Sequence, residues 1–182
     1  MNKIKRVSKI FSLLFQAVFI VFLLSNIIGW IVTPSPIVYS GKLGFTFDVI
    51  SKHIPILHAL SAQEKVFGFL ISIIPLAINL WLIANLVKLF KLYQQGKIFL
   101  LENVCAIKRI GIALLLSQIV APFYEAAISA VLTWNNPPGH RVSMASFDGT
   151  NVALVIAALI ILLVSWVMAE ACKLQNENEM TI

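Results

Sequence analysis

Glu125 is the residue whose type and position could carry chemistry in this sequence. It lies inside the apolar run Ile110–Trp134, and an ionisable side chain in such a run is a functional candidate because lipid penalises charge. Gln118 would share its helical face, and Asn79 and Asn26 are polar residues in two other apolar runs. These four are the intramembrane polar positions that we expect to matter.

Two interpretations of Glu125 are open. The first is a proton- or ion-responsive carboxylate. The second is a protonated or hydrogen-bonded side chain that helps to hold helices together, and Asn26 at a similar estimated depth could be its partner. Because the sequence offers no basic partner within the membrane, we favour the second interpretation.

The remaining reactive side chains form no recognisable site. Cys105 and Cys172 make no Cys-x-x-Cys pair, which argues against disulfide chemistry. His53, His58 and His140 lie in two connections, where solvated histidines are a simpler interpretation than a metal site. No phosphate loop, zinc-protease helix or nucleophile elbow is present. We therefore expect no catalytic residues, metal or cofactor, and no enzyme.

The elements that must position these residues follow from composition. Of 182 residues, 59% are hydrophobic and 12% are charged, whereas a soluble domain has about 25% charged residues. Four apolar runs are each about 20 residues long, enough to cross a bilayer as a helix. They are residues 10–32, 66–90, 110–134 and 152–171. The sequence predicts an all-α integral membrane protein, a bundle of four transmembrane helices in a single domain.

The basic residues predict the orientation. Ten Lys and Arg residues lie in the N-terminal segment, the 91–109 connection with its flank, and the 172–182 tail, against four in the connections 33–65 and 135–151. Since positive charge favours the cytoplasmic side, both termini and the 91–109 loop should be cytoplasmic. Trp30 and Trp134 would then lie at the outer interface.

The two outer connections carry strand signals. Residues 37–39 and 43–47 flank Ser40-Gly41-Lys42, which indicates a β-hairpin. Residues 141–147 alternate between apolar and polar side chains, as a half-buried strand does. We expect a small extracytoplasmic β-sheet cap built from both outer loops, with irregular loops as the alternative.

The inner connection reads GKIFLLENVCAIKRIG, and together with the tail VMAEACKLQNENEMTI it resembles the bacterial domain-of-unknown-function family 2975. The residues that carry the resemblance, here called the cytoplasmic motif, are Gly96, Phe99, Glu102, Asn103, Arg109 and Gly111. The resemblance implies a small four-span protein of the bacterial cytoplasmic (inner) membrane without an assigned activity. It also implies a gene neighbour encoding a small helix-turn-helix regulator.

Three functions are compatible with these observations. We favour a non-enzymatic protein that senses or interacts through its cytoplasmic loop and tail, whose opposite charges could form a weak latch. The alternatives are a small oligomeric transporter or channel subunit centred on Glu125 and, least favoured, a membrane enzyme. The expected partners are the lipid bilayer and a cytoplasmic protein, by resemblance a helix-turn-helix regulator. No direct nucleic-acid contact is expected, and a homo-oligomer stays open.

The orientation can be tested with reporter fusions. A reporter after residue 182 should be active in the cytoplasm, and one inserted between residues 34 and 65 should be active outside, because ten of the fourteen basic residues lie on the predicted inner side. Activity of both reporters on the same side would contradict the four-span topology.

Overall fold

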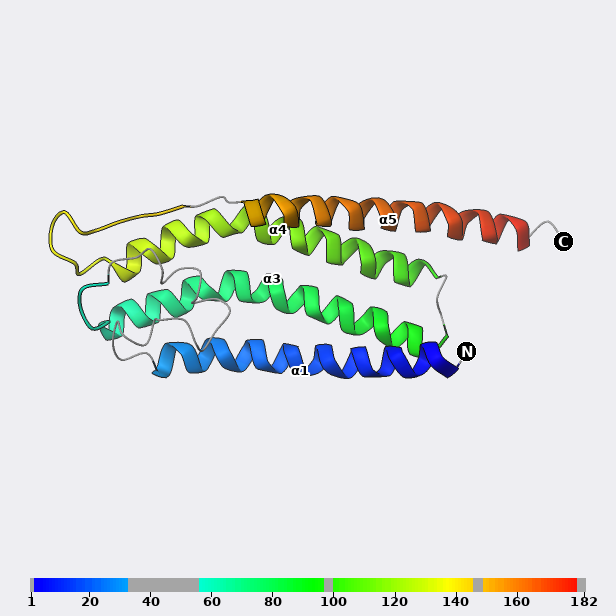
Figure 1. The fold of residues 1–182 in the computed structure, drawn as a ribbon, viewed down its shortest axis with the longest axis horizontal. Helices are drawn as coiled ribbons and strands as arrows, with labels where there is room; N and C mark the ends of the chain where they lie inside the picture. The colour runs from blue at the N-terminus through cyan, green and yellow to red at the C-terminus, as the bar shows by residue number, and fades with distance from the viewer. Residues whose placement is uncertain (1, 33–55, 97–99, 146–148, 180–182) are drawn as a thin grey trace. The chain divides into compact units, whose positions relative to one another are not determined.

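The computed structural model describes residues 2–32, 56–96, 100–145 and 149–179, and Figure 1 shows their helices in chain order. The helices are α1 (Asn2–Val32), α3 (Ala62–Gln94), α4 (Leu101–Leu132) and α5 (Gly149–Glu179). Each of these four is long and apolar enough to cross a membrane. The described chain is therefore that of a multi-pass membrane protein.

The helices continue beyond the apolar runs at several ends. α1 takes in the basic N-terminal segment, and α5 continues through most of the segment expected to be a tail, to Glu179. α3 ends at Gln94, and Gly96 follows with a φ of 79°, the left-handed conformation in which glycine commonly ends a helix. α4 begins at Leu101 with Glu102 in its first turn, where a carboxylate suits the positive end of the helix dipole.

The chain forms two compact units. The first comprises residues Met1–Phe19, Ile78–Gln118 and Asp148–Ile182. Within it, Phe11 of α1 stacks on Phe90 of α3 with ring centroids 5.2 Å apart. Leu89 of α3 packs in one cluster with Ala106 and Ile110 of α4. These contacts hold the second half of α3 between α1 and α4 within this unit.

The second unit comprises residues Ile20–Ala77 and Ile119–Phe147. Its centre is Trp30 of α1, which is 4% exposed and packs with Ile128 and Leu132 of α4. Trp30 Nε1 donates to Ser72 Oγ at 3.1 Å, and Asn26 Nδ2 donates to the same oxygen at 3.2 Å. The buried indole is thus fixed both by packing and by a hydrogen bond.

The prediction of a β-sheet cap is wrong for the described residues. The described residues contain no strand. Within residues 141–145 the backbone N–H of Val142 donates to Thr133 Oγ1 at 3.1 Å, and that of Met144 donates to Ser129 Oγ at 2.9 Å. Alternate residues therefore bond to Ser129 in the last turn of α4 and to Thr133 directly after it, so the alternation reflects docking on the end of a helix. The hairpin expected at residues 37–47 lies outside the described residues.

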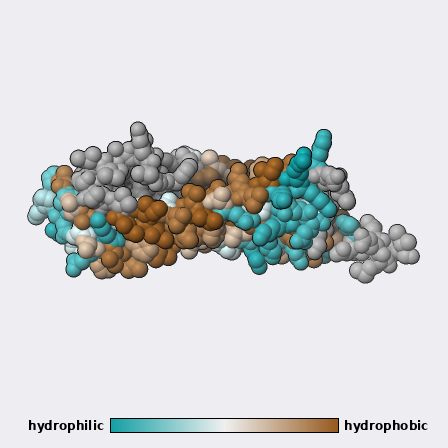
Figure 2. Space-filling view, turned by 90° about the horizontal axis from the view of Figure 1, so that it is seen from below, coloured by the Kyte–Doolittle hydropathy of each residue, from teal (hydrophilic) through white to brown (hydrophobic). Residues whose placement is uncertain are grey.

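Large apolar side chains are exposed along every described helix, most densely on α1 and α5. Figure 2 shows broad hydrophobic areas on the displayed face, with hydrophilic side chains gathered away from them. In water such areas would cause association. In a bilayer they contact lipid, so the exposure fits a membrane-spanning chain.

Gly68 is the position at which the second unit should tolerate least change. A Cβ built there would overlap three ring atoms of Trp30, so Gly68→Ala must displace the buried indole. We expect the variant to lose about 1–3 kcal/mol of stability, the usual cost of overpacking, measured by thermal unfolding in detergent. Gly149→Ala, whose Cβ meets nothing within 4 Å, is the matched control. Equal stability of both variants would contradict this close packing.

Candidate functional site

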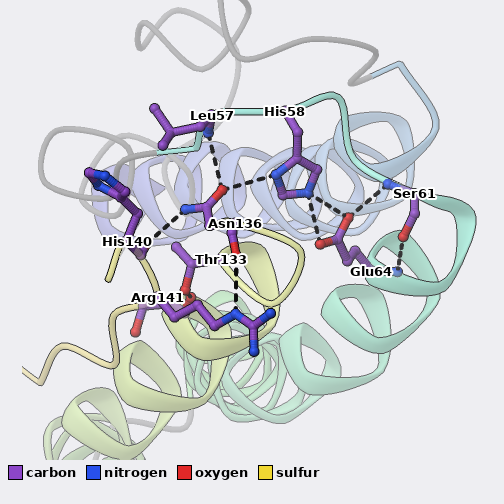
Figure 3. A network of polar contacts seen from close by, with 9 residues as sticks. Leu57, His58, Ser61, Glu64, Thr133, Asn136, His140 and Arg141 are labelled. Carbon is purple, nitrogen blue, oxygen red and sulfur yellow. Dashed lines mark hydrogen bonds and ion pairs between the residues drawn. The ribbon is translucent and has the colours of Figure 1, made fainter. Parts of the chain in front are cut away.

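The described polar side chains with the densest hydrogen bonding lie in the second unit, around the start of α3 and the turn after α4 (Figure 3). We call this cluster the polar junction. It consists of His58, Ser61, Glu64, Asn136 and Arg141. It joins the connection that precedes α3 to the connection that follows α4.

Glu64 is placed by the way α3 begins. Ser61 precedes the helix and accepts a hydrogen bond from the Glu64 backbone N–H at 3.3 Å, while Glu64 Oε2 accepts one from the Ser61 backbone N–H at 2.8 Å. This reciprocal pair is a capping box, whose sequence signature is Ser-x-x-Glu. The residues Ser61-Ala-Gln-Glu64 carry that signature, so the sequence contained a signal that our interpretation missed. The cap holds a carboxylate that is only 4% exposed.

Asn136 is the hub of the polar junction. Its side chain is 1% exposed, and its Oδ1 accepts a hydrogen bond from the Leu57 backbone N–H at 3.3 Å. Its Nδ2 donates to the His140 carbonyl at 2.9 Å, and its own carbonyl accepts from Arg141 Nε at 3.1 Å. The two side-chain bonds define which end of the amide is oxygen, because one partner is a donor and the other an acceptor.

His58 bridges two hydrogen-bond acceptors. Its Nδ1 lies 3.0 Å from Asn136 Oδ1, and its Nε2 lies 2.9 and 3.1 Å from the carboxylate oxygens of Glu64. A neutral imidazole has one N–H and one acceptor nitrogen, whereas the imidazolium donates from both. While Glu64 is ionised, only the protonated ring can donate to both acceptors, and it also supplies a countercharge for the buried carboxylate. The bridge therefore depends on a proton.

The junction contains a serine, a histidine and a carboxylate, but they are not arranged for nucleophilic catalysis. A serine nucleophile needs its hydroxyl hydrogen-bonded to a histidine nitrogen. Here both nitrogens of His58 face Glu64 and Asn136, and Ser61 Oγ accepts from the backbone of Glu64. In the part of the chain that is described, no three His, Cys, Asp or Glu side chains gather as metal ligands would. The arrangement suits proton binding coupled to loop docking.

The four expected intramembrane polar residues are divided between the two units. Asn26 is buried and bonds to Ser72, and Glu125 is half-buried on α4, where its carbonyl accepts from Ser129 Oγ at 2.7 Å. Gln118 and Asn79 belong to the first unit. Gln118 is buried, with its Nε2 3.0 Å from Ser117 Oγ and its Oε1 without a partner among the described residues. Asn26 therefore pairs with Ser72, and its expected meeting with Glu125 stays a prediction.

The cytoplasmic motif divides into shape-determining and exposed positions. Gly96 provides the left-handed turn after α3, and Asn103 is fully buried in α4. Gly111 is buried against α5, and a Cβ added there would lie 2.8 Å from the Leu162 side chain. Glu102 and Arg109 are exposed, and Phe99 lies outside the described residues. Packing thus explains the buried positions of the motif. Its two charged side chains are exposed, so packing does not explain them.

The expected charge latch between loop and tail is not visible in the described contacts. Glu170 pairs with Lys173 on its own helix at 3.9 Å, and both side chains are exposed. Pairs of this kind contribute about 0–1 kcal/mol. The side chains of Lys97, Glu177 and Glu179 lie outside the described residues, so the latch stays a prediction.

Removal of the hub should loosen the polar junction. Asn136→Ala leaves the Leu57 N–H, His58 and the His140 carbonyl without their partner, and we expect a loss of about 1–3 kcal/mol for the buried polar groups. Thermal unfolding in detergent measures the loss. The neighbouring Asn135 is exposed, so Asn135→Ala should change stability by less than about 0.5 kcal/mol. Equal effects of the two substitutions would show that Asn136 is not the hub.

Comparison with known proteins gives one match, and it covers the region of the motif. Neither the curated proteins nor the solved structures contain a match to this chain. The family model described as "Protein of unknown function (DUF2975)" matches residues 49–182, which include α3, α4, α5 and the cytoplasmic motif. The resemblance inferred from the inner connection and the tail is thereby confirmed, and the chain belongs to the DUF2975 family.

Proposed function

We propose that this protein is a non-enzymatic membrane sensor that responds to protonation of His58 and acts through the 91–109 loop and the segment from residue 172. The observation that carries the proposal is the pair of acceptors on either side of the His58 ring, Asn136 Oδ1 at 3.0 Å and Glu64 Oε1 at 2.9 Å. Histidine commonly changes charge between about pH 5 and 8. A bridge that needs the charged ring is therefore sensitive to the loss of that proton.

The direction of the response follows from the hydrogen bonds. At low pH the imidazolium donates to both acceptors, and the connection around Leu57 is held to Asn136. When pH rises and the ring loses a proton, one nitrogen becomes an acceptor and faces another acceptor. That contact changes from attractive to repulsive, so the polar junction weakens as pH rises.

The charges around the ring support this direction. Glu64 from α3 is the charged side chain in described contact with His58, with Nε2 and Oε1 2.9 Å apart. Arg141 reaches the junction at the Asn136 carbonyl, and His140 contributes its own carbonyl to Asn136. Arg141 thus bonds to the backbone carbonyl of Asn136. The His58 ring bonds to a different atom of that residue, the side-chain Oδ1.

The output that we propose is the cytoplasmic loop with the C-terminal segment. α3 begins at the polar junction and ends at Gln94, and α4 begins at Leu101 and ends at Leu132, close in sequence to Asn136. Both helices therefore connect the junction covalently to the loop that carries Glu102 and Arg109. With both termini cytoplasmic in a bacterial inner membrane, His58 would report the outer pH to a cytoplasmic protein partner, by resemblance a helix-turn-helix regulator.

The transporter alternative has less support. It requires polar side chains that line a common path around Glu125. Within the second unit, the described side-chain bonds of Asn26 go to Ser72. The proton-dependent bridge needs no such path, and it is complete within the second unit.

The sensing proposal is tested by cross-linking on the inner side while the outer pH is changed. In proteoliposomes, cysteines at Gln95 and Asn176, with Cys105 and Cys172 replaced, should cross-link with yields that differ by about twofold or more between outer pH values of about 5.5 and 8, the range in which histidine commonly changes charge. His58→Gln should abolish the difference because it cannot gain a proton.

The matched control is His140→Gln, because the described contacts of His140 use its backbone and not its ring. This variant should keep the pH response. A response that survives in His58→Gln, or that is lost equally in His140→Gln, would contradict the assignment of the sensor to His58. The absence of any pH response in the parent protein would contradict sensing itself.

A further inference from the structure

We propose that a hollow between the end of α4 and residues 141–143 binds the phosphate of an anionic phospholipid. The hollow has a volume of about 280 Å³. Its lining residues are Ala130, Thr133, Trp134, Arg141, Val142 and Ser143. The inference is independent of the proton response of His58.

Arg141 supplies the anion-binding group. Its Nε donates to the Asn136 carbonyl at 3.1 Å, which fixes the plane of the guanidinium at one edge. Figure 3 shows the two terminal nitrogens beyond this bond, and no described carboxylate forms an ion pair with them. An oriented guanidinium fork matches two phosphate oxygens, so this arginine is prepared for a phosphate.

The walls of the hollow are fixed by the hydrogen bonds that replace the expected strand. Thr133 Oγ1 accepts from the Val142 N–H at 3.1 Å, and Ser143 Oγ donates to the Ala126 carbonyl at 3.1 Å. These bonds hold the returning chain against the last turns of α4. The hollow is consequently a defined feature of the second unit.

Trp134 indicates a lipid in preference to a free anion. It follows the end of α4 by two residues, and its side chain is 63% exposed. Exposed tryptophans prefer the boundary between hydrocarbon and head groups. An apolar wall of Trp134, Ala130 and Val142 next to the Arg141 fork matches an amphiphile, with its phosphate on the fork and its glycerol and upper acyl chain on the wall. A free phosphate would use the fork alone.

Lipid binding to the purified full-length protein in detergent tests this assignment. Native mass spectrometry should show that phosphatidylglycerol binds the parent protein at least about tenfold more tightly than it binds Arg141→Gln, as expected for the loss of a charge-assisted contact. Arg141→Lys should bind with intermediate affinity, because it keeps the charge and loses the fork. Trp134→Ala should also weaken binding, and it leaves the Arg141 bond to Asn136 in place.

Lys65→Gln is the matched control, since it removes one positive charge from the same unit outside the hollow. It should bind phosphatidylglycerol within about twofold of the parent. Equal weakening by Lys65→Gln and Arg141→Gln would overturn the site in favour of general charge attraction. Equal binding of phosphatidylcholine would overturn the preference for an anionic lipid. Two results together would overturn the lipid in favour of free phosphate. Inorganic phosphate would displace phosphatidylglycerol from the parent protein, and Trp134→Ala would bind phosphatidylglycerol as tightly as the parent does.

Discussion

The side-chain amide of Asn136 joins two connections whose bonded residues are 78 and 79 positions apart in the sequence. Through it the segment before α3 is attached to the turn after α4, and the backbone carbonyl of the same residue orients Arg141. A buried amide with unmatched partners would be costly, so the loops on either side must adopt the conformation that satisfies it. The chain at Leu57 and the bridging ring of His58 take their positions from this requirement.

The same requirement governs the hydroxyl groups of the helices. Several serines bond to a carbonyl of the preceding turn, for example Ser117 to Leu114 and Ser165 to Leu162, which satisfies a polar group where lipid offers no partner. Ser129 and Thr133 go further, because their oxygens also accept backbone N–H groups of the returning chain. The hydroxyl groups at the end of α4 thus accept the backbone N–H groups of residues 142 and 144, which in a sheet would bond to a neighbouring strand.

The sequence predicted the helices well because long apolar runs are strong local signals. The strand predicted at residues 141–147 is wrong for the described residues. Alternation of apolar and polar side chains shows that every second residue faces the protein, but it does not say whether a strand or a helix lies there. His58 and Asn136 were not paired from the sequence, since no local pattern links residues so far apart. By contrast, Ser61 and Glu64 are three positions apart, and the Ser-x-x-Glu pattern could have placed that carboxylate.

The length of α5 has a mechanical consequence. Its 31 residues form a helix of roughly 46 Å at about 1.5 Å per residue, longer than the roughly 30 Å of bilayer hydrocarbon. A rigid rod of this length is a lever: a tilt of about 10° moves one end sideways by roughly 8 Å relative to the other. Because helices tilt to match the thickness of the surrounding bilayer, the position of the last turn of α5 would vary with membrane composition.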